Sequence, residues 1–117
     1  MKKLKLMTIL GTRPEIIRLS ATIKKCDQYF DHILVHTGQN WDYALNQIFF
    51  ENLGLRAPDH YLDSAGETLG ETMGNIIARA YEVMVREKPD ALLILGDTNS
   101  ALSAISAKRL KIPIFHM

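Results

Sequence analysis

The stretch that most constrains the fold is the apolar run Leu4–Leu10, which is followed by Gly-Thr-Arg-Pro-Glu at positions 11–15. A run with almost no polar alternation is typical of a parallel strand that is buried on both faces. Gly11 permits a tight turn, Thr12 is suited to cap a helix, and Pro14 fits the first helical turn. The stretch therefore predicts a buried strand, a tight turn and then a helix.

The turn after this strand carries two charged side chains, Arg13 and Glu15. Amide groups at a helix N-terminus, with a guanidinium group beside them, form a good receptor for an anion such as phosphate. The alternative is a structural turn in which both charged side chains are simply solvated. We favour anion binding for Arg13, because it lies just before the expected start of the helix.

The rest of the chain repeats the alternation of apolar strand and amphipathic helix. Further strands are expected at 32–37, 60–62, 91–95 and 112–115, and helices at 14–26, 41–53 and 68–87 and after residue 98. The residues expected on the buried helix faces are Ile16, Leu19, Ile23 and Cys26, then Trp41, Leu45, Ile48, Phe49 and Leu53, then Leu69, Met73, Ile76, Ile77, Ala80 and Met84, and finally Ala101, Leu102, Ile105 and Leu110. Thr68 and Glu71 have the spacing of a capping box. Repeated units of this kind predict an α/β fold with a doubly wound, Rossmann-like parallel sheet in the strand order 3-2-1-4-5.

This strand order places the ends of the first and fourth strands side by side, where doubly wound folds bind ligands. The turns that meet there are Gly-Thr-Arg at 11–13 and Gly-Asp-Thr at 96–98, so a cation and a carboxylate should face one cleft. The site candidates at this edge are Arg13, His36, Gln39, Asp97, Thr98 and His116. Asp97 is either an acid–base group or a carboxylate favoured by a helix dipole. His36 is either a ligand or a histidine with local hydrogen bonds.

Composition excludes several classes of function. The net charge is +1 and no acidic or basic block occurs, which gives no support for binding to nucleic acid or to an anionic membrane surface. No apolar run approaches the roughly 20 residues of a membrane span. The single cysteine, Cys26, falls on an apolar helix face, so we expect a buried thiol and a reducing cytoplasm.

Two common nucleotide-binding motifs and a metal pattern are missing from the sequence. No G-x-G-x-x-G follows the first strand, which argues against a standard dinucleotide site. No G-x-x-x-x-G-K-[ST] occurs, so the chain is not a P-loop NTPase. The four histidines and the single cysteine lack the spacing of metal ligands, and a zinc site is not expected.

Four motifs together carry a family resemblance. They are Gly-Thr-Arg-Pro-Glu at 11–15, His-Thr-Gly-Gln at 36–39, Gly-Asp-Thr at 96–98 and Pro-Ile-Phe-His at 113–116. In this order and spacing they resemble the N-terminal part of the non-hydrolysing UDP-N-acetylglucosamine 2-epimerases, over the whole chain. The run at 36–43 is similar to one branch of that family, which epimerises C2 of a UDP-2-acetamido-2,6-dideoxy-hexose. Its product, UDP-N-acetyl-L-fucosamine, serves capsule or O-antigen synthesis.

The resemblance implies the N-terminal half of a GT-B-like enzyme, with the active site between two Rossmann-like domains. The family eliminates UDP across C1–C2, leaves a bound 2-acetamidoglycal and re-adds UDP with inversion at C2, without a nicotinamide cofactor or a metal. By the same resemblance Asp97 is the catalytic carboxylate and Arg13 lies near the diphosphate. The other substrate-binding positions that it implies are Arg18, His36, Gln39, Thr98 and His116. A cytoplasmic homodimer that binds a UDP-sugar, with no nucleic-acid or membrane partner, is the corresponding expectation.

The chain departs from the family pattern at three places. Arg18 stands where many members have lysine, which keeps the charge and changes its geometry. Asn40 and Trp41 replace the His-Arg that many bacterial members carry where a second, regulatory UDP-sugar binds. The chain stops at Met117, where the family continues into Glu-Ala-Gly. We therefore interpret residues 1–117 as an incomplete N-terminal domain without the C-terminal UDP-binding domain, and we expect it to be inactive alone.

Three other readings remain open from the sequence. One is a stand-alone α/β module that binds a phosphate-bearing ligand without turnover. Another is the N-terminal half of a GT-B glycosyltransferase, in which the cleft holds an acceptor. The third is a flavodoxin-like or response-regulator domain, although the latter needs an acidic pair after the first strand, where this chain has Gly-Thr-Arg.

Overall fold

A five-stranded sheet in the order β3-β2-β1-β4-β5 forms the centre of the structure, a computed structural model that describes residues 3–38, 43–95 and 98–117. The strands are β1 (Lys5–Leu10), β2 (Asp31–His36), β3 (His60–Tyr61), β4 (Ala91–Ile94) and β5 (Ile114–His116). The helices are α1 (Arg13–Tyr29), α2 (Tyr43–Asn52), α3 (Leu69–Glu87), the short 3-10 helix η1 (Asn99–Leu102) and α4 (Ser103–Arg109). Every strand pair is parallel, which confirms the predicted fold class and strand order.

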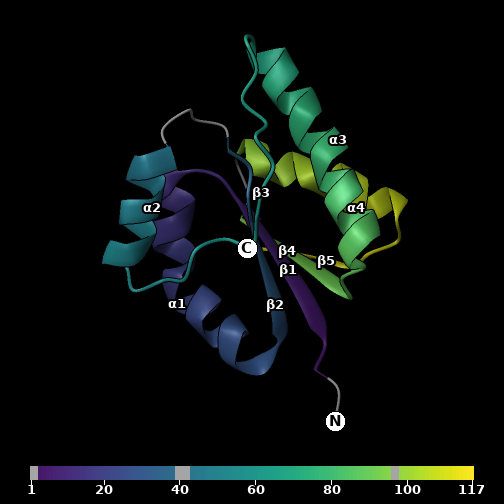
Figure 1. Cartoon of the computed structure of the whole chain (residues 1–117). Coiled ribbons are helices and arrows are strands. Elements are labelled where there is room, and N and C mark those ends of the chain that lie inside the picture. Colours follow the sequence, from purple (N-terminus) through teal and green to yellow (C-terminus); the bar gives the residue numbers. More distant parts are fainter. Residues whose placement is uncertain (1–2, 39–42, 96–97) are drawn as a thin grey trace.

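Helices cover both faces of the sheet, with α1 and α2 on one side and α3 and α4 on the other (Figure 1). The core beneath α3 and α4 includes Met7, Ile9, Ile33, Val35, Ala80, Val83, Met84, Leu92 and Ile94. The core beneath α1 and α2 includes Leu10, Ile16, Leu19, Ile23, Leu34 and Phe50. Apolar side chains on both faces explain why the central strands lack a polar alternation.

Helix α1 has the predicted buried face and a later end than predicted. Ile16, Leu19, Ile23 and Cys26 are all buried. The helix continues past Cys26 to Tyr29, where the backbone N–H of Phe30 donates to the carbonyl of Cys26 at 2.9 Å. The apolar pattern stops before the helix does, because the last turn is polar and faces outward. The sequence pattern therefore located the face and missed the end.

The faces of the other helices were predicted less well. Ile48, Leu69, Met73 and Ile105 are exposed, so their assignment to buried faces was wrong. The buried residues of α3 are instead Thr72, Ile76, Ala80, Val83 and Met84, and those of α4 are Ser103, Ser106 and Ala107. Ser106 Oγ donates to the carbonyl of Ile77 at 2.6 Å, which satisfies a hydroxyl where α4 packs on α3. The buried face of α4 consists of small residues, so a pattern of large apolar residues does not reveal it. Trp41 lies outside the described residues.

The last strand begins two residues after the predicted start. The backbone N–H of Ile112 donates to the carbonyl of Ala107 at 2.9 Å, so this residue still belongs to the end of α4. Lys111 has a φ of 59°, in the left-handed region. This backbone conformation ends a helix, and β5 starts only at Ile114.

Part of the sheet face on the α1 side carries apolar side chains that meet solvent. A shallow cavity of about 500 Å³ lies there, and its lining includes Leu6, Cys26, Phe30, Leu93 and Phe115. Phe115 is 59% exposed. Parallel strands are normally covered on both faces, so the described residues leave β4 and β5 without a covering helix on this side. None of the described helices has the length and apolar character needed to cross a membrane.

Candidate functional site

Glu15 is the centre of the edge where β1 and β4 end. Its side chain is fully buried, although it is ionisable and lies in the first turn of α1. Glu15 Oε2 accepts hydrogen bonds from the backbone N–H groups of Gly11 and Thr12, both at 2.8 Å. In return, Thr12 Oγ1 accepts from the backbone N–H of Glu15 at 3.4 Å. These bonds form a capping box, which fixes the turn after β1 and starts α1 at Arg13.

The same carboxylate reaches the turn after β4. Thr98 Oγ1 donates to Glu15 Oε1, and Ser100 Oγ donates to Glu15 Oε2 at 3.2 Å. These partners lie 83 and 85 positions away from Glu15 in the sequence. The structure therefore brings the two predicted turns together, through a side chain that the sequence interpretation treated as a possible solvated charge. That interpretation of Glu15 was wrong.

The arrangement changes what the helix N-terminus can bind. The N–H groups of Gly11 and Thr12 are directed to Glu15, and those of Glu15 and Ile16 to the side chain and carbonyl of Thr12. An incoming phosphate would have to compete with these bonds. At this edge, the guanidinium group of the exposed residue Arg13 is therefore better suited to contact an anion than the backbone amides.

The other predicted site residues are distributed along this edge. Arg18 is exposed on α1, about 1.4 turns after Arg13, and His116 is exposed at the end of β5. Thr98 is half-buried beside Glu15. Asp97 and Gln39 lie outside the described residues, so the structure gives no position for the predicted catalytic carboxylate or for the predicted glutamine.

His36, at the end of β2, is fully buried. Its Nδ1 accepts a hydrogen bond from the backbone N–H of Gly38 at 2.9 Å, so the neutral ring carries its proton on Nε2. The ring lies 5.3 Å from that of Tyr61 and 6.1 Å from that of Phe50, centroid to centroid. Among the described residues, Nε2 has no hydrogen-bond partner. Burial lowers the pKa of His36 to about 4, against the opposing effect of the Glu15 carboxylate, so the imidazole is neutral near pH 7.

A short segment after β3 is bound to the end of β2. The backbone N–H and the hydroxyl of Ser64 both donate to the carbonyl of Thr37, at 3.0 and 2.6 Å. Gly38 has a φ of 66°, and an added Cβ there would lie 3.1 Å from the backbone nitrogen of Asp63. Both the backbone conformation and the close approach of this segment require glycine at position 38. This segment leads into α3, whose N-terminus therefore lies at the same edge.

Thr68 caps α3 as predicted, and Glu71 does not complete the capping box. Thr68 Oγ1 accepts from the backbone N–H of Glu71 at 3.1 Å. Glu71 Oε2 accepts instead from the backbone N–H of Glu67 at 2.9 Å. Thr72 Oγ1 accepts from the N–H of Gly66 at 2.9 Å, so Glu71 and Thr72 both bind the segment that leads into the helix.

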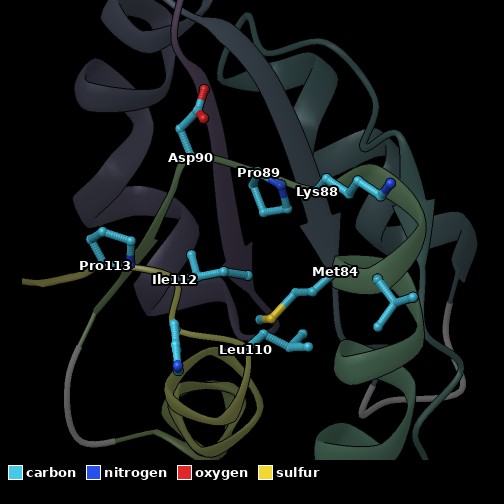
Figure 2. A pocket seen from close by; sticks show the side chains of 9 residues that line it. Met84, Lys88, Pro89, Asp90, Leu110, Ile112 and Pro113 are labelled. Atoms are coloured by element: carbon cyan, nitrogen blue, oxygen red, sulfur yellow. The ribbon is translucent and has the colours of Figure 1, made fainter.

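A separate cavity lies at the opposite edge of the sheet, between the end of α3 and the connection from α4 to β5 (Figure 2). It has a volume of about 450 Å³. Met84, Leu110 and Ile112 converge on it in Figure 2, and Asp90 at its rim accepts from the backbone N–H of Lys5 at 2.8 Å. Asp90 therefore holds the start of β1 in place. We keep the candidate functional site at the other edge, where the turns after β1 and β4 meet. Within residues 3–38, 43–95 and 98–117, no group of three or more metal-binding side chains is placed to hold a metal ion.

The sequence contained a signal for Glu15. Thr12 and Glu15 have the Thr-x-x-Glu spacing of a capping box, which the interpretation applied to Thr68 and not to this turn. No comparable signal exists for the bonds from Thr98 and Ser100, because they depend on the pairing of β1 with β4.

Comparison with known proteins supports a common architecture. The family model described as UDP-N-acetylglucosamine 2-epimerase matches residues 23–117. A UDP-2,3-diacetamido-2,3-dideoxy-D-glucuronate 2-epimerase of Pseudomonas aeruginosa is 41% identical, over 97% of this chain and 33% of the relative. A UDP-N-acetylglucosamine 2-epimerase of Methanocaldococcus jannaschii is 40% identical, over 97% of this chain and 32% of the relative. The chain thus spans about a third of the length of these relatives.

Solved structures give the same result. The UDP-N-acetylglucosamine 2-epimerase of Rickettsia bellii superposes with a TM-score of 0.90 at 56% identity, over 98% of this chain and 31% of that one. The Methanocaldococcus jannaschii enzyme, in complex with UDP-GlcNAc and UDP, superposes with a TM-score of 0.89 at 39% identity, over 97% and 32%. These neighbours share the parallel sheet with helices on both faces, and the matched third is their N-terminal part.

Proposed function

The chain belongs to the UDP-N-acetylglucosamine 2-epimerase family, and on this premise we propose that it forms the N-terminal domain of an isomerase that inverts C2 of a UDP-2-acetamido sugar. The observation that carries the proposal is the junction of the two turns after β1 and β4, which Glu15 connects at the ligand-binding edge of the sheet. We propose that a second, C-terminal domain completes this enzyme, which the roughly threefold greater length of the relatives supports. We propose that this second domain binds most of the UDP.

The proposed reaction has two steps. In the first, a base removes the proton from C2, the bond from C1 to the UDP oxygen breaks, and the electron pair leaves with UDP. The C1–C2 double bond that forms belongs to a 2-acetamidoglycal, which stays bound. In the second, a proton is delivered to the opposite face of C2 and a phosphate oxygen of UDP bonds again to C1. Such an elimination needs a proton acceptor at C2 and a cation for the departing diphosphate.

The residues of this domain suit the second of these needs. Arg13 is an exposed residue at the start of α1, and Arg18 is an exposed residue of the same helix about 1.4 turns later. We propose that Arg13 binds the diphosphate, and that Arg18, Gln39, Thr98 and His116 complete the substrate contacts.

His36 is the buried member of the predicted set. Its backbone-fixed, neutral imidazole lies beneath the surface. We propose that it shapes the rim on which the substrate lies.

We propose Asp97 as the catalytic carboxylate. Its place in the sequence, directly before Thr98, puts it next to the residue that donates to Glu15. The proposal for Asp97 rests on this adjacency and on the family motif.

The natural sugar is the finer part of the proposal. UDP-N-acetylglucosamine is the first candidate, and UDP-2-acetamido-2,6-dideoxy-L-talose, which would give UDP-N-acetyl-L-fucosamine, is the second. We also propose that the full-length enzyme is a cytoplasmic homodimer that supplies precursors of cell-surface polysaccharide.

The test uses the full-length enzyme in D2O with each sugar nucleotide, followed by NMR at C2. We expect deuterium at C2 together with the epimer, abolished in Asp97→Asn and reduced at least about 100-fold in kcat/KM in Arg13→Ala. Arg86→Ala is the matched control, because Arg86 lies in the last turn of α3, which ends at the opposite edge of the sheet. Binding of every sugar without exchange or epimer would contradict epimerisation and favour a non-catalytic binding module. Transfer of the sugar to an added acceptor would favour a glycosyltransferase.

A further inference from the structure

We propose that Glu15 is a positioning residue of the epimerase reaction, whose buried carboxylate holds the turn of Arg13 and the turn of Thr98 in a fixed relation. This inference rests on the proposed function for its effect on turnover. Its structural part, the coupling of two turns through one carboxylate, can be measured independently of activity.

The position of Glu15 indicates that its side chain links the turns after β1 and β4 and does not contact the substrate. Glu15 is fully buried. Its oxygens accept from three donors in the first turn, the N–H groups of Gly11 and Thr12 and the hydroxyl of Thr12. They also accept from the hydroxyls of Thr98 and Ser100 in the second turn. A carboxylate that already accepts five hydrogen bonds is poorly suited to take a further proton from a substrate.

The link joins two rigid elements. On one side, the capping box ties the carboxylate to the first turn of α1. On the other side, Ser100 lies in η1, and its carbonyl accepts from Ser103 Oγ at 2.7 Å at the start of α4. One turn can therefore be displaced relative to the other only by breaking hydrogen bonds to a charged acceptor, which are stronger than neutral ones.

This coupling is important for the proposed chemistry because the two turns have different tasks. Arg13 would hold the departing diphosphate, while the turn after β4 would carry the group that acts at C2. A displacement of about 1 Å between catalytic groups can reduce a rate by about 100-fold. A loss of the link should therefore reduce kcat more than it raises KM.

The experiment compares two buried serines that differ in what they bind. Ser100→Ala removes one donor to Glu15, whereas Ser106→Ala removes a buried hydroxyl bond to Ile77 on α3. In the full-length enzyme we expect both to lower the urea midpoint by similar amounts. Ser100→Ala should reduce kcat by about 10-fold with KM within about threefold, and Ser106→Ala should leave kcat within about twofold.

A second pair guards against a Ser100 variant that fails to fold. Thr98→Ser keeps the hydroxyl that donates to Glu15, and Thr98→Val removes it at nearly constant shape. In the 117-residue chain we expect amide exchange at Gly11 and Thr12 near the wild-type rate for the serine variant and about 10-fold faster for the valine variant. Equal exchange rates in the two variants would overturn the proposal, as would equal losses of kcat in Ser100→Ala and Ser106→Ala.

Hydrogen exchange of the backbone amides separates this proposal from the proposed function. In the 117-residue chain, Ser100→Ala should accelerate exchange at Gly11 and Thr12 by about 10-fold, and Ser106→Ala should not. Acceleration in an enzyme that lacks epimerase activity would refute the proposed function and retain the link. Unchanged exchange in Ser100→Ala would refute the link, whatever the wild-type activity.

Discussion

The burial of His36 should make the free energy of unfolding decrease at acidic pH. Its pKa is about 4 in the folded chain and near 6.5 in an unfolded one. Between these values the unfolded chain binds a proton that the folded chain does not, so stability falls as the pH falls. Integrated over this interval, the loss is about 2 kcal/mol at pH 5 and about 3 kcal/mol at pH 4. Above about pH 7.5 the contribution of His36 is constant.

The variant His36→Asn isolates this effect. Asparagine offers a carbonyl oxygen in place of Nδ1 for the N–H of Gly38 and does not titrate in this range. Burial also lowers the pKa of His32, but His32 is present in both proteins and cancels from the difference. We expect the free energy of unfolding of wild type minus that of His36→Asn to fall by about 2 kcal/mol from pH 7 to pH 5.

The assay is urea unfolding of the 117-residue chain, followed by circular dichroism at several pH values. Ser106→Ala serves as the control, because neither side chain titrates and the hydroxyl of Ser106 donates to the carbonyl of Ile77 on α3. Its difference from wild type should change by less than about 0.5 kcal/mol over the same interval. A constant difference between wild type and His36→Asn would refute the argument from burial.

Three further predictions follow from the geometry. Glu15→Ala leaves the buried N–H of Gly11 and the partly buried N–H and hydroxyl of Thr12 without their acceptor, and it should lower the free energy of unfolding by about 3–5 kcal/mol in urea titrations. A loss below about 1 kcal/mol would contradict this account of these hydrogen bonds. Gly38→Ala should lower the free energy of unfolding by about 1–2 kcal/mol more than Gly54→Ala does, because both glycines have positive φ but only an added Cβ at position 38 would lie within 3.2 Å of backbone atoms, those of Asp63. Equal thermal midpoints of the two variants would contradict this. Cys26 should react with iodoacetamide at least about 10-fold more slowly in the folded chain than in urea, because burial, and to a smaller extent the charge of Asp27, raises the pKa of its thiol. Equal reaction rates, measured by mass spectrometry, would contradict this.

The fold was predictable because its determinants are local or strictly periodic. The apolar run of β1 and the Gly-Thr-Arg-Pro-Glu turn indicate a strand and a helix from adjacent residues alone. Repetition of such units then leaves few topologies, since parallel connections are almost always right-handed. The observed strand order agrees with this reasoning.

The helix faces were harder to predict where small and hydroxylated residues form the contact. In α4, Ser103 and Ser106 are buried while Ile105 is exposed. A serine hydroxyl is compatible with burial once it donates to a carbonyl of the neighbouring helix, as Ser106 does. Whether such an acceptor exists depends on tertiary packing, which sequence periodicity does not contain.

For the candidate site, the sequence predicted that the segments of Arg13 and Thr98 lie together, and it did not predict the hydrogen bonds between them. Strand order alone was sufficient to place the turns of Arg13 and Thr98 together. The sequence predicts that the amides of the first turn are available to a phosphate. In the structure, the amides of Gly11 and Thr12 donate to Glu15 instead. This difference arises because a carboxylate three residues into the helix can fold back on its own turn and also accept hydrogen bonds from Thr98 and Ser100, which are distant in sequence.

The shared carboxylate also constrains how this family can diverge. Glu15 accepts hydroxyl donors from Thr98 and Ser100, so a substitution at any one of these positions changes the fitness effect of substitutions at the other two. We therefore expect the residue types at these three positions to covary among homologues. They should do so although more than 80 residues separate the first position from the others. Exposed neighbours such as Ile105 are free of this constraint and should drift independently.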